Sequence, residues 1–209
     1  MSDAAAWDAR YGTGSWLFGQ EPNRYLESLS PRLRPGMTAL CLGDGEGRNG
    51  VWLAGRGLSV TAVDWSATGL ARAADLARRR GVPLATAVAD LARWNWPVAR
   101  YDLIAWIFVH LPPADRAAVA AGACQALAPG GLLVLEGFAA AQQGRRCGGP
   151  RDPALLWSRA TAEAAFAGLE LLECLEGGVL LDEGPRHQGV AEVVRGIWRR
   201  PAGERVAAG

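Results

Sequence analysis

Glycines alternate with polar residues in one short segment, residues 42–49, which reads Leu-Gly-Asp-Gly-Glu-Gly-Arg-Asn. An apolar stretch typical of a strand precedes the segment, and a stretch typical of a helix follows it. Alternate glycines allow a backbone to approach a ligand closely, and the N–H groups at a helix N-terminus favour anionic or polar ligand groups. The candidates for ligand contact in this segment are Gly43, Asp44, Gly45, Gly47, Arg48 and Asn49.

Carboxylates end the next two predicted strands. Asp64 follows the strand predicted over residues 58–63. It lies about 20 residues after the first glycine, a spacing that suits a carboxylate accepting hydrogen bonds from two ribose hydroxyls and that argues against a ribose 2′-phosphate. Asp90 ends the strand predicted over residues 84–89. The two carboxylates and the glycine segment together predict a nucleoside site.

Two other interpretations of the glycine segment stay open, a nicotinamide-cofactor site and a turn that binds no ligand. The nicotinamide pattern G-x-G-x-x-G needs a third glycine at the position that Arg48 occupies in this chain. An arginine at the start of a helix instead suits a ligand that carries a carboxylate. A nucleotide-dependent oxidoreductase is therefore the less favoured enzyme class.

The chain has only two histidines, and histidine is the side chain best matched to proton transfer near neutral pH. His110 follows the strand predicted over residues 101–108, and His187 lies in a predicted hairpin. Each is interpreted in two ways. Either both contact a substrate and are catalytic residues that transfer a proton, or His110 caps a strand end and His187 fixes a loop.

Strand-like and helix-like segments alternate along the chain, which predicts a mostly parallel sheet with helices on both faces. The connection of residues 177–188 is too short for a crossover helix, so the last two strands should be antiparallel. Ligands of such sheets bind at the carboxyl ends of the strands, where the glycine turn, both carboxylates and both histidines should meet. The predicted strands are residues 37–42, 58–63, 84–89, 101–108, 131–137, 169–176 and 189–198, and the predicted helices begin at Arg48 and cover residues 66–80, 115–127 and 154–167.

These elements predict one doubly wound α/β domain over residues 1–209. Within it we expect an N-terminal lid or helix over residues 1–34 and a cofactor-binding core over residues 35–137. Residues 138–209 would form the acceptor side, with a long loop rich in glycine, arginine and glutamine followed by a helix and closing strands.

The motifs, taken in order, resemble those of class I S-adenosylmethionine-dependent methyltransferases. The matching residues are Gly43-x-Gly45-x-Gly47, Asp64, Asp90-Leu91, Tyr101-Asp102-Leu103-Ile104 and Leu127-Ala128-Pro129-Gly130-Gly131. A narrower likeness, to the tellurite-resistance (TehB-like) or thiopurine methyltransferase-like branch, rests on residues 16–23, 45–49 and 183–189. The resemblance covers nearly the whole chain. It implies a Rossmann-like sheet of seven strands with the last one antiparallel, and methyl transfer from S-adenosyl-L-methionine, with S-adenosyl-L-homocysteine as product.

The resemblance also implies roles for single residues. Asp64 should hold the ribose, Asp90 the adenine amino group, and the Leu91 N–H the adenine ring. Trp65 is either a partner of the adenine face or a core residue, and Trp106 lies either beside the methionine portion or in the core. Trp7 and Ser66 complete the expected cofactor contacts. One departure is Cys41, where the family usually has an acidic residue that serves the methionine end, and Asp44 would compensate.

The acceptor should be a small molecule with a thiol, a chalcogen oxyanion, or a nitrogen or oxygen nucleophile. Residues 7–22 carry aromatic side chains among glycines, which suits a lid, although a helix stapled to the core is the alternative. The apolar run of residues 106–109 predicts a pocket that orients the acceptor by shape. The expected acceptor contacts are Trp16, Phe18, Phe138, Gln142, Arg145 and Arg146, of which the two arginines either hold an anion or are solvated.

The composition of the chain argues against several other classes of function. A formal net charge of +1 gives no field that favours nucleic acid, and no apolar run reaches the length of a membrane span. The start has no pattern of a signal peptide, and four widely spaced cysteines suit reduced thiols, so we expect a cytoplasmic monomer or homodimer without a metal. A catalytically silent S-adenosylmethionine-binding module is the second hypothesis, and Cys41 is its main support.

Overall fold

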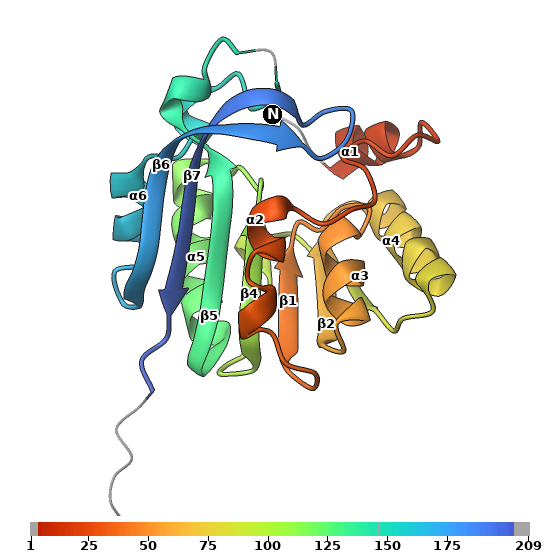
Figure 1. Ribbon diagram of the computed structural model, residues 1–209, viewed down its shortest axis with the longest axis horizontal. Helices are drawn as coiled ribbons and strands as arrows, with labels where there is room; N and C mark the ends of the chain where they lie inside the picture. The colour runs from red at the N-terminus through yellow and green to blue at the C-terminus, as the bar shows by residue number, and fades with distance from the viewer. Residues whose placement is uncertain (1–3, 146, 203–209) are drawn as a thin grey trace, which may run out of the picture.

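A computed structural model describes residues 4–145 and 147–202 of the chain. A seven-stranded sheet runs through the molecule in the order β3-β2-β1-β4-β5-β7-β6, with helices on both faces (Figure 1). The strands are β1 Thr38–Leu42, β2 Ser59–Asp64, β3 Ala85–Val88, β4 Tyr101–Ile107, β5 Leu127–Phe138, β6 Glu170–Asp182 and β7 Gln188–Arg199. The α-helices are α1 Ala4–Tyr11, α2 Arg24–Glu27, α3 Arg48–Gly55, α4 Ala67–Arg80, α5 Pro113–Ala126 and α6 Arg159–Ala165, and the 3-10 turns are η1 Ser30–Arg32, η2 Leu91–Arg93, η3 Ala140–Gln142 and η4 Pro153–Leu155.

The predicted topology is confirmed. β1 to β5 pair in parallel, and β7 lies between β5 and β6 and is antiparallel to both. This is the doubly wound sheet with a reversed final strand that the short last connection predicted. The carboxyl ends of the parallel strands therefore lie at one edge, and β6 and β7 extend past that edge and bend across it (Figure 1).

The predicted bounds were wrong in the second half of the chain. β5 begins at Leu127, the last residue of the helix predicted over residues 115–127, because Leu127 already pairs with Tyr101. The helix predicted over residues 154–167 is a 3-10 turn followed by a shorter helix, α6, which Ser158 caps. Trp157 lies in the break between these two segments and is only 1% exposed. Its backbone forms an isolated β-bridge to Ala139. Burial of this large ring overrides the helical pattern of the local sequence.

β6 is also longer than predicted and reaches Asp182, so residues 183–187 alone connect it to β7. The starts and ends of β2, β3, β4 and α4 agree with the predicted ranges within one or two residues, and Ser66 caps α4. The division of the chain at residues 34 and 137 stays a prediction. Among the described residues, no helix has both the length and the apolar character that a membrane crossing needs.

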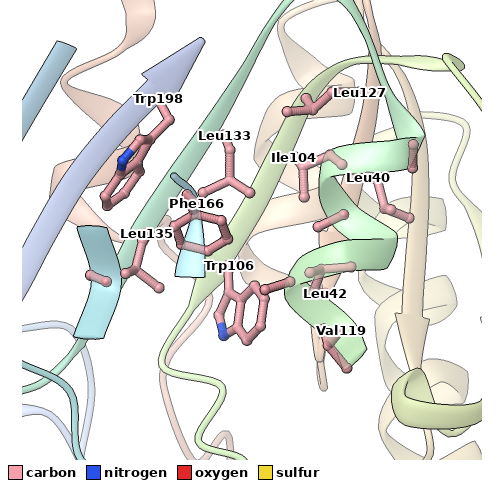
Figure 2. Close-up of a cluster of buried hydrophobic side chains, with 14 of the residues drawn as sticks. Leu40, Leu42, Ile104, Trp106, Val119, Leu127, Leu133, Leu135, Phe166 and Trp198 are labelled. Atoms are coloured by element: carbon pink, nitrogen blue, oxygen red, sulfur yellow. The ribbon is translucent and has the colours of Figure 1, made fainter. Parts of the chain in front are cut away.

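A cluster of large side chains fills one face of the sheet (Figure 2). Trp106 at its centre is 0% exposed, and its ring meets those of Trp157 and Phe166 edge-on at centroid distances of 5.6 and 5.9 Å. The indole N–H of Trp106 donates to the carbonyl oxygen of Val109, 2.9 Å away. Of the two roles left open for Trp106, the structure therefore gives its ring the one in the core.

We predict that Trp106→Ala lowers the free energy of unfolding by about 4 kcal/mol, because removal of a large buried ring leaves a cavity that the packed neighbours cannot fill. Urea unfolding of the variant and the parent measures the change. Trp52→Ala, which removes a half-buried ring from α3, is the matched control and should cost much less. Equal losses for the two variants would contradict the central position given to Trp106.

Candidate functional site

The glycine turn between β1 and α3 lies at the carboxyl edge of the sheet, as predicted. Gly45 has φ +54, and a Cβ there would lie 2.3 Å from the hydroxyl oxygen of Tyr11. Gly69 on α4 meets the same ring, since its Cβ would lie 2.9 Å from Tyr11 Cδ2. The ring of Tyr11 therefore lies over the turn, and only glycine at these two positions leaves room for it. Tyr11 was not among the predicted cofactor contacts.

Asp64 ends β2 and joins the turn to the start of α4. Its Oδ2 accepts a hydrogen bond from the Gly45 N–H at 2.9 Å, and its Oδ1 accepts one from the Ser66 N–H at 2.8 Å. Burial raises the pKa of this carboxyl group. Both donors are neutral backbone groups, so each oxygen keeps a further lone pair that can accept from a hydroxyl group.

The other predicted nucleoside contacts surround Asp64. Asp90 follows β3, accepts from the Ala92 N–H at 3.0 Å and pairs with the exposed Arg93. Trp65 is half-buried beside Asp64. The hydroxyl of Ser66 caps α4 by accepting from the Gly69 N–H, and it donates to Asp8. Ser66 therefore holds the edge together, whereas Asp90 and Trp65 follow the ends of adjacent strands as predicted.

The polar side chains of the glycine turn bind the protein itself. Asp44 accepts from the Gly50 N–H at 3.1 Å, and burial raises its pKa to about 7. Arg48 forms a buried ion pair with Glu183 at 2.9 Å. Asn49 accepts a hydrogen bond from the backbone N–H of Asn23, 2.9 Å away. Because Arg48 already pairs with a carboxylate of this chain, the predicted pairing with a ligand carboxylate would compete with it.

The N-terminal segment is docked on this edge by backbone and side-chain contacts. Asp8 of α1 accepts from the Thr68 N–H at 2.9 Å, and Glu46 of the turn accepts from the Leu17 N–H at 2.9 Å. Burial raises the pKa of Glu46, which also pairs with Arg72 at 2.8 Å. In this structure the segment is docked over the turn, and its role as a lid or as a stapled helix stays a prediction.

Asn23 connects two buried carboxylates from distant parts of the chain. Its side-chain N–H group donates to Glu183 at 2.9 Å and also to Glu136 of β5. Arg195 of β7 donates to the other oxygen of Glu136 at 2.7 Å. Asn23, Glu136 and Glu183 are each 5% exposed or less. The network ties the N-terminal segment, the sheet and the β6–β7 hairpin together.

His187 lies among three phenylalanine rings where these segments meet. Its ring centroid lies 4.4 Å from that of Phe108, 4.8 Å from Phe18 and 5.6 Å from Phe138. His187 is 4% exposed, and its burial lowers its pKa. Phe108 has φ +54, a conformation that costs a bulky residue free energy and that occurs mostly where structure or function demands it. We call Phe18, Phe108, Phe138 and His187 the ring cluster.

His110 stacks on Phe138, at a centroid distance of 5.5 Å. Its Nδ1 lies 3.2 Å from the Leu155 carbonyl oxygen, and its Nε2 lies 3.5 Å from the Phe138 backbone nitrogen. Burial lowers the pKa of His110 to about 4, so the ring is neutral near pH 7. The two predicted histidines therefore meet at one site, but both ring nitrogens of His110 face backbone groups.

The predicted acceptor contacts separate into two groups. Phe18 and Phe138 belong to the ring cluster. Gln142 donates to the Gly148 carbonyl oxygen and accepts from the Glu192 N–H, so its amide holds the neighbouring loop. Trp16 and Arg145 lie elsewhere: Trp16 packs under Arg72 on α4, and Arg145 is exposed and pairs with Glu192. Arg146 lies outside the described residues.

Trp7 of α1 lies over the same edge and stacks on Tyr11 at 5.4 Å. Among the described residues, no group of three or more His, Cys, Asp or Glu side chains is arranged to hold a metal ion. Sequence reasoning missed the roles of four residues: Tyr11, Asn23, Glu46 and Glu183. All but Tyr11 belong to motifs that carried the narrower family likeness, so the motifs pointed to them although their chemistry was not assigned.

Comparisons with known proteins agree with this geometry. Residues 39–131 match a family model described as a methyltransferase domain. No curated protein matches the chain. A solved protein concerned with conversion of a disulfide bond into a thioacetal group during echinomycin biosynthesis is 20% identical, with 96% of this chain and 94% of that one covered and a TM-score of 0.77.

Two further solved structures are similar. The N-methyltransferase NodS from Bradyrhizobium japonicum WM9, in complex with S-adenosyl-L-homocysteine, is 20% identical over 95% of this chain and 98% of that one, with a TM-score of 0.72. TehB from Haemophilus influenzae is 18% identical over 94% of this chain and 66% of that one, with a TM-score of 0.70. Residues 39–131 thus resemble a methyltransferase domain, and the chain has the Rossmann-like fold of these solved structures.

We predict that Asn23→Ala lowers the free energy of unfolding by about 3 kcal/mol at pH 8, because two buried carboxylates lose the donor between them. The loss should be smaller at pH 5. Burial and the nearby Glu183 raise the pKa of Glu136, so the folded variant takes up a proton more readily than the unfolded chain as the pH falls. Urea unfolding at both pH values measures this.

Asn49→Ala is the control for that experiment. It removes a buried asparagine whose hydrogen bond reaches a neutral backbone group, so its loss of stability should not depend on pH. A loss for Asn23→Ala that is equal at pH 5 and pH 8 would show that the asparagine does not separate two charged carboxylates.

Proposed function

We propose that this chain is a methyltransferase that transfers a methyl group from S-adenosyl-L-methionine to a small-molecule acceptor. The observation that carries the proposal is Asp64, a buried carboxylate that ends β2 and is fixed to the glycine turn by the Gly45 N–H. Its remaining lone pairs suit the two hydroxyls of a ribose. The match of residues 39–131 to a methyltransferase domain supports the same conclusion.

The residues around Asp64 fit the rest of such a nucleoside. Asp90 offers carboxylate oxygens to an exocyclic amino group, Leu91 follows it at the start of η2 and would offer its N–H to the base, and the half-buried Trp65 offers an aromatic surface. Two negative side chains favour hydroxyl and amino groups over phosphates. The donor and acceptor set therefore supports a nucleoside without phosphate.

The sulfonium centre of bound S-adenosyl-L-methionine supplies an electrophilic methyl group. The protein's part is to position the acceptor in line with that group and to exclude water. Tyr11, Trp7 and the docked N-terminal segment cover the turn and serve the second task. His187 is neutral near pH 7 and can accept a proton from an acceptor that arrives protonated.

The ring cluster favours an uncharged acceptor with an apolar or aromatic body. Phe18, Phe108 and Phe138 present apolar surface around the single polar ring of His187. Such surroundings disfavour a bare anion, which would lose its hydration without gaining a cation in return. Arg145, predicted to hold an anion, lies exposed in an ion pair with Glu192. Among the acceptors considered, a thiol therefore fits better than a chalcogen oxyanion.

A catalytically silent binding module is the second candidate. Cys41, 1% exposed, stands where an acidic residue would serve the methionine end, and burial raises the pKa of its thiol well above the usual value. In addition, Arg48 is occupied by Glu183. A module of this kind would bind S-adenosyl-L-methionine without turnover by any acceptor.

We predict that Asp64→Ala weakens binding of S-adenosyl-L-homocysteine by about a hundredfold, because two hydrogen bonds to a charged acceptor are lost, each worth about 1.5 kcal/mol. Titration calorimetry measures the affinity. Asp75→Ala, on an exposed part of α4, is the matched control and should bind as the parent does. An Asp64→Ala variant that is folded and binds as tightly as the parent would refute the ribose contact.

We predict that release of S-adenosyl-L-homocysteine in the presence of the enzyme is fastest with aliphatic or aromatic thiols, and slow with selenite and tellurite. The ring cluster offers apolar contacts to the former and no compensating charge to the latter. Small amines and thiopurines complete the panel. Turnover of tellurite, together with no turnover of any thiol, would contradict the assignment of thiols as the acceptor class. Tight cofactor binding with no turnover of any acceptor would favour the silent module.

A further inference from the structure

Glu183 and His187 stand at the two ends of the turn that joins β6 to β7. The Glu183 N–H donates to the His187 carbonyl oxygen at 2.9 Å, and the His187 N–H donates to the Gly184 carbonyl oxygen at 3.0 Å. These bonds close the turn and place both side chains on the same side of it. His187 Nδ1 lies 3.9 Å from Glu183 Oε2 and, though buried, has no hydrogen-bond partner in the structure.

The Glu183 carboxylate is held from several directions. Its Oε1 accepts from the Asn23 side chain at 2.9 Å and from the Arg24 N–H at 3.0 Å, and its Oε2 accepts from Arg48 at 2.9 Å. Burial opposes its ionisation. The nearby His187 ring, the charge of Arg48 and the bonds from these donors together outweigh burial and lower the pKa of Glu183 to about 2. The group is therefore a fixed anion beside the imidazole ring.

The tip of the hairpin is also attached to the N-terminal segment. The Arg186 N–H donates to the Leu17 carbonyl oxygen at 3.3 Å. A Cβ on Gly184, which has φ +109, would lie 2.5 Å from the backbone of Phe18 and Gly19. These contacts leave the turn little freedom to rotate, and they hold the His187 ring against Phe18.

We infer that Glu183 is a positioning residue, which keeps the proton of neutral His187 on Nδ1 and so leaves the lone pair of Nε2 for the methyl acceptor. A small rotation of the ring brings Nδ1–H within hydrogen-bonding distance of Oε2, and the fixed anion favours that tautomer. When Nε2 takes a proton from the acceptor, the same carboxylate stabilises the imidazolium that forms. The role of Nε2 as the atom that takes a proton from the acceptor rests on the proposed function. The position of the His187 proton on Nδ1 does not.

Three charged or titratable groups face His187: Glu183 on its own turn, Arg48 on α3 and His110 after β4. Burial lowers the pKa of His187 first, and the positive charge of Arg48 lowers it further, while Glu183 raises it. Removal of the negative charge at position 183 should therefore lower the pKa of His187 again, because Arg48 would then act without opposition.

Glu136 provides a matched control within the same network. It is buried, accepts from the same Asn23 side chain and pairs with Arg195 at 2.7 Å. The second oxygen of its carboxylate accepts from Arg195 of β7, and His187 is not among its hydrogen-bond partners. Glu136→Gln thus perturbs the network and the packing to a similar degree as Glu183→Gln, but it leaves the neighbour of His187 in place.

Nitrogen-15 NMR of histidine-labelled protein tests the inference. The chain has two histidines, so His110→Asn assigns both sets of signals. We expect neutral His187 to carry its proton on Nδ1 in the parent. In Glu183→Gln we expect its pKa to fall by about one unit, a roughly tenfold loss of proton affinity, and in Glu136→Gln to stay within about 0.3 unit of the parent. The acid limb of the pH profile of kcat/KM should move to lower pH in Glu183→Gln alone.

A His187 proton on Nε2 in the parent protein would overturn the inference, and that result needs no variant to fold. An equal fall in the pKa of His187 in both glutamine variants would overturn it as well. Failure of the proposed function is distinguished by the assay, because absence of methyl transfer leaves the tautomer and the titration of His187 measurable. If the enzyme transfers methyl groups while neutral His187 carries its proton on Nε2, the proposed function stands but Glu183 is not its positioning residue.

Discussion

Pairing of buried charge at the carboxyl edge of the sheet is the constraint on which this structure depends. Asp64, Glu46, Glu136 and Glu183 are all 6% exposed or less, and a buried carboxylate without a partner costs several kcal/mol. The partners come from elsewhere in the chain: backbone N–H groups of the glycine turn and the N-terminal segment, the Asn23 side chain, and the arginines of α3 and β7. Charge pairing thus brings the distant segments together.

The aromatic part of the site follows from that pairing. Once Asn23 and Glu183 hold the N-terminal segment against the β6–β7 hairpin, Phe18 and His187 meet Phe108 and Phe138 from the ends of β4 and β5. The result is a polar ring enclosed by apolar ones, next to a turn that suits a nucleoside. Two environments with different chemistry, one that we propose for a cofactor and one for an acceptor, therefore share a single edge of the sheet.

The sequence predicts the parts of this arrangement that depend on local pattern. Alternating strands and helices and a short last connection were enough for the topology, and spacing alone placed Asp64 beside the glycine turn. Contacts between distant residues were not predictable in this way. Asn23 and Glu183 are separated by 160 positions, and Trp157 breaks a helical pattern because its ring is needed in the core. For the same reason Arg48, which suits a ligand by type and position, is found in an internal ion pair.

We propose that the glycine turn and Asp64 hold the cofactor while the ring cluster faces its reactive end. A crystal structure of the chain with S-adenosyl-L-homocysteine tests this arrangement. We expect the ribose hydroxyls on the carboxylate of Asp64, the base beside Trp65 and Asp90, and the sulfur directed toward Phe108 and His187. Nucleoside bound away from Asp64, or a sulfur atom directed away from the ring cluster, would contradict it.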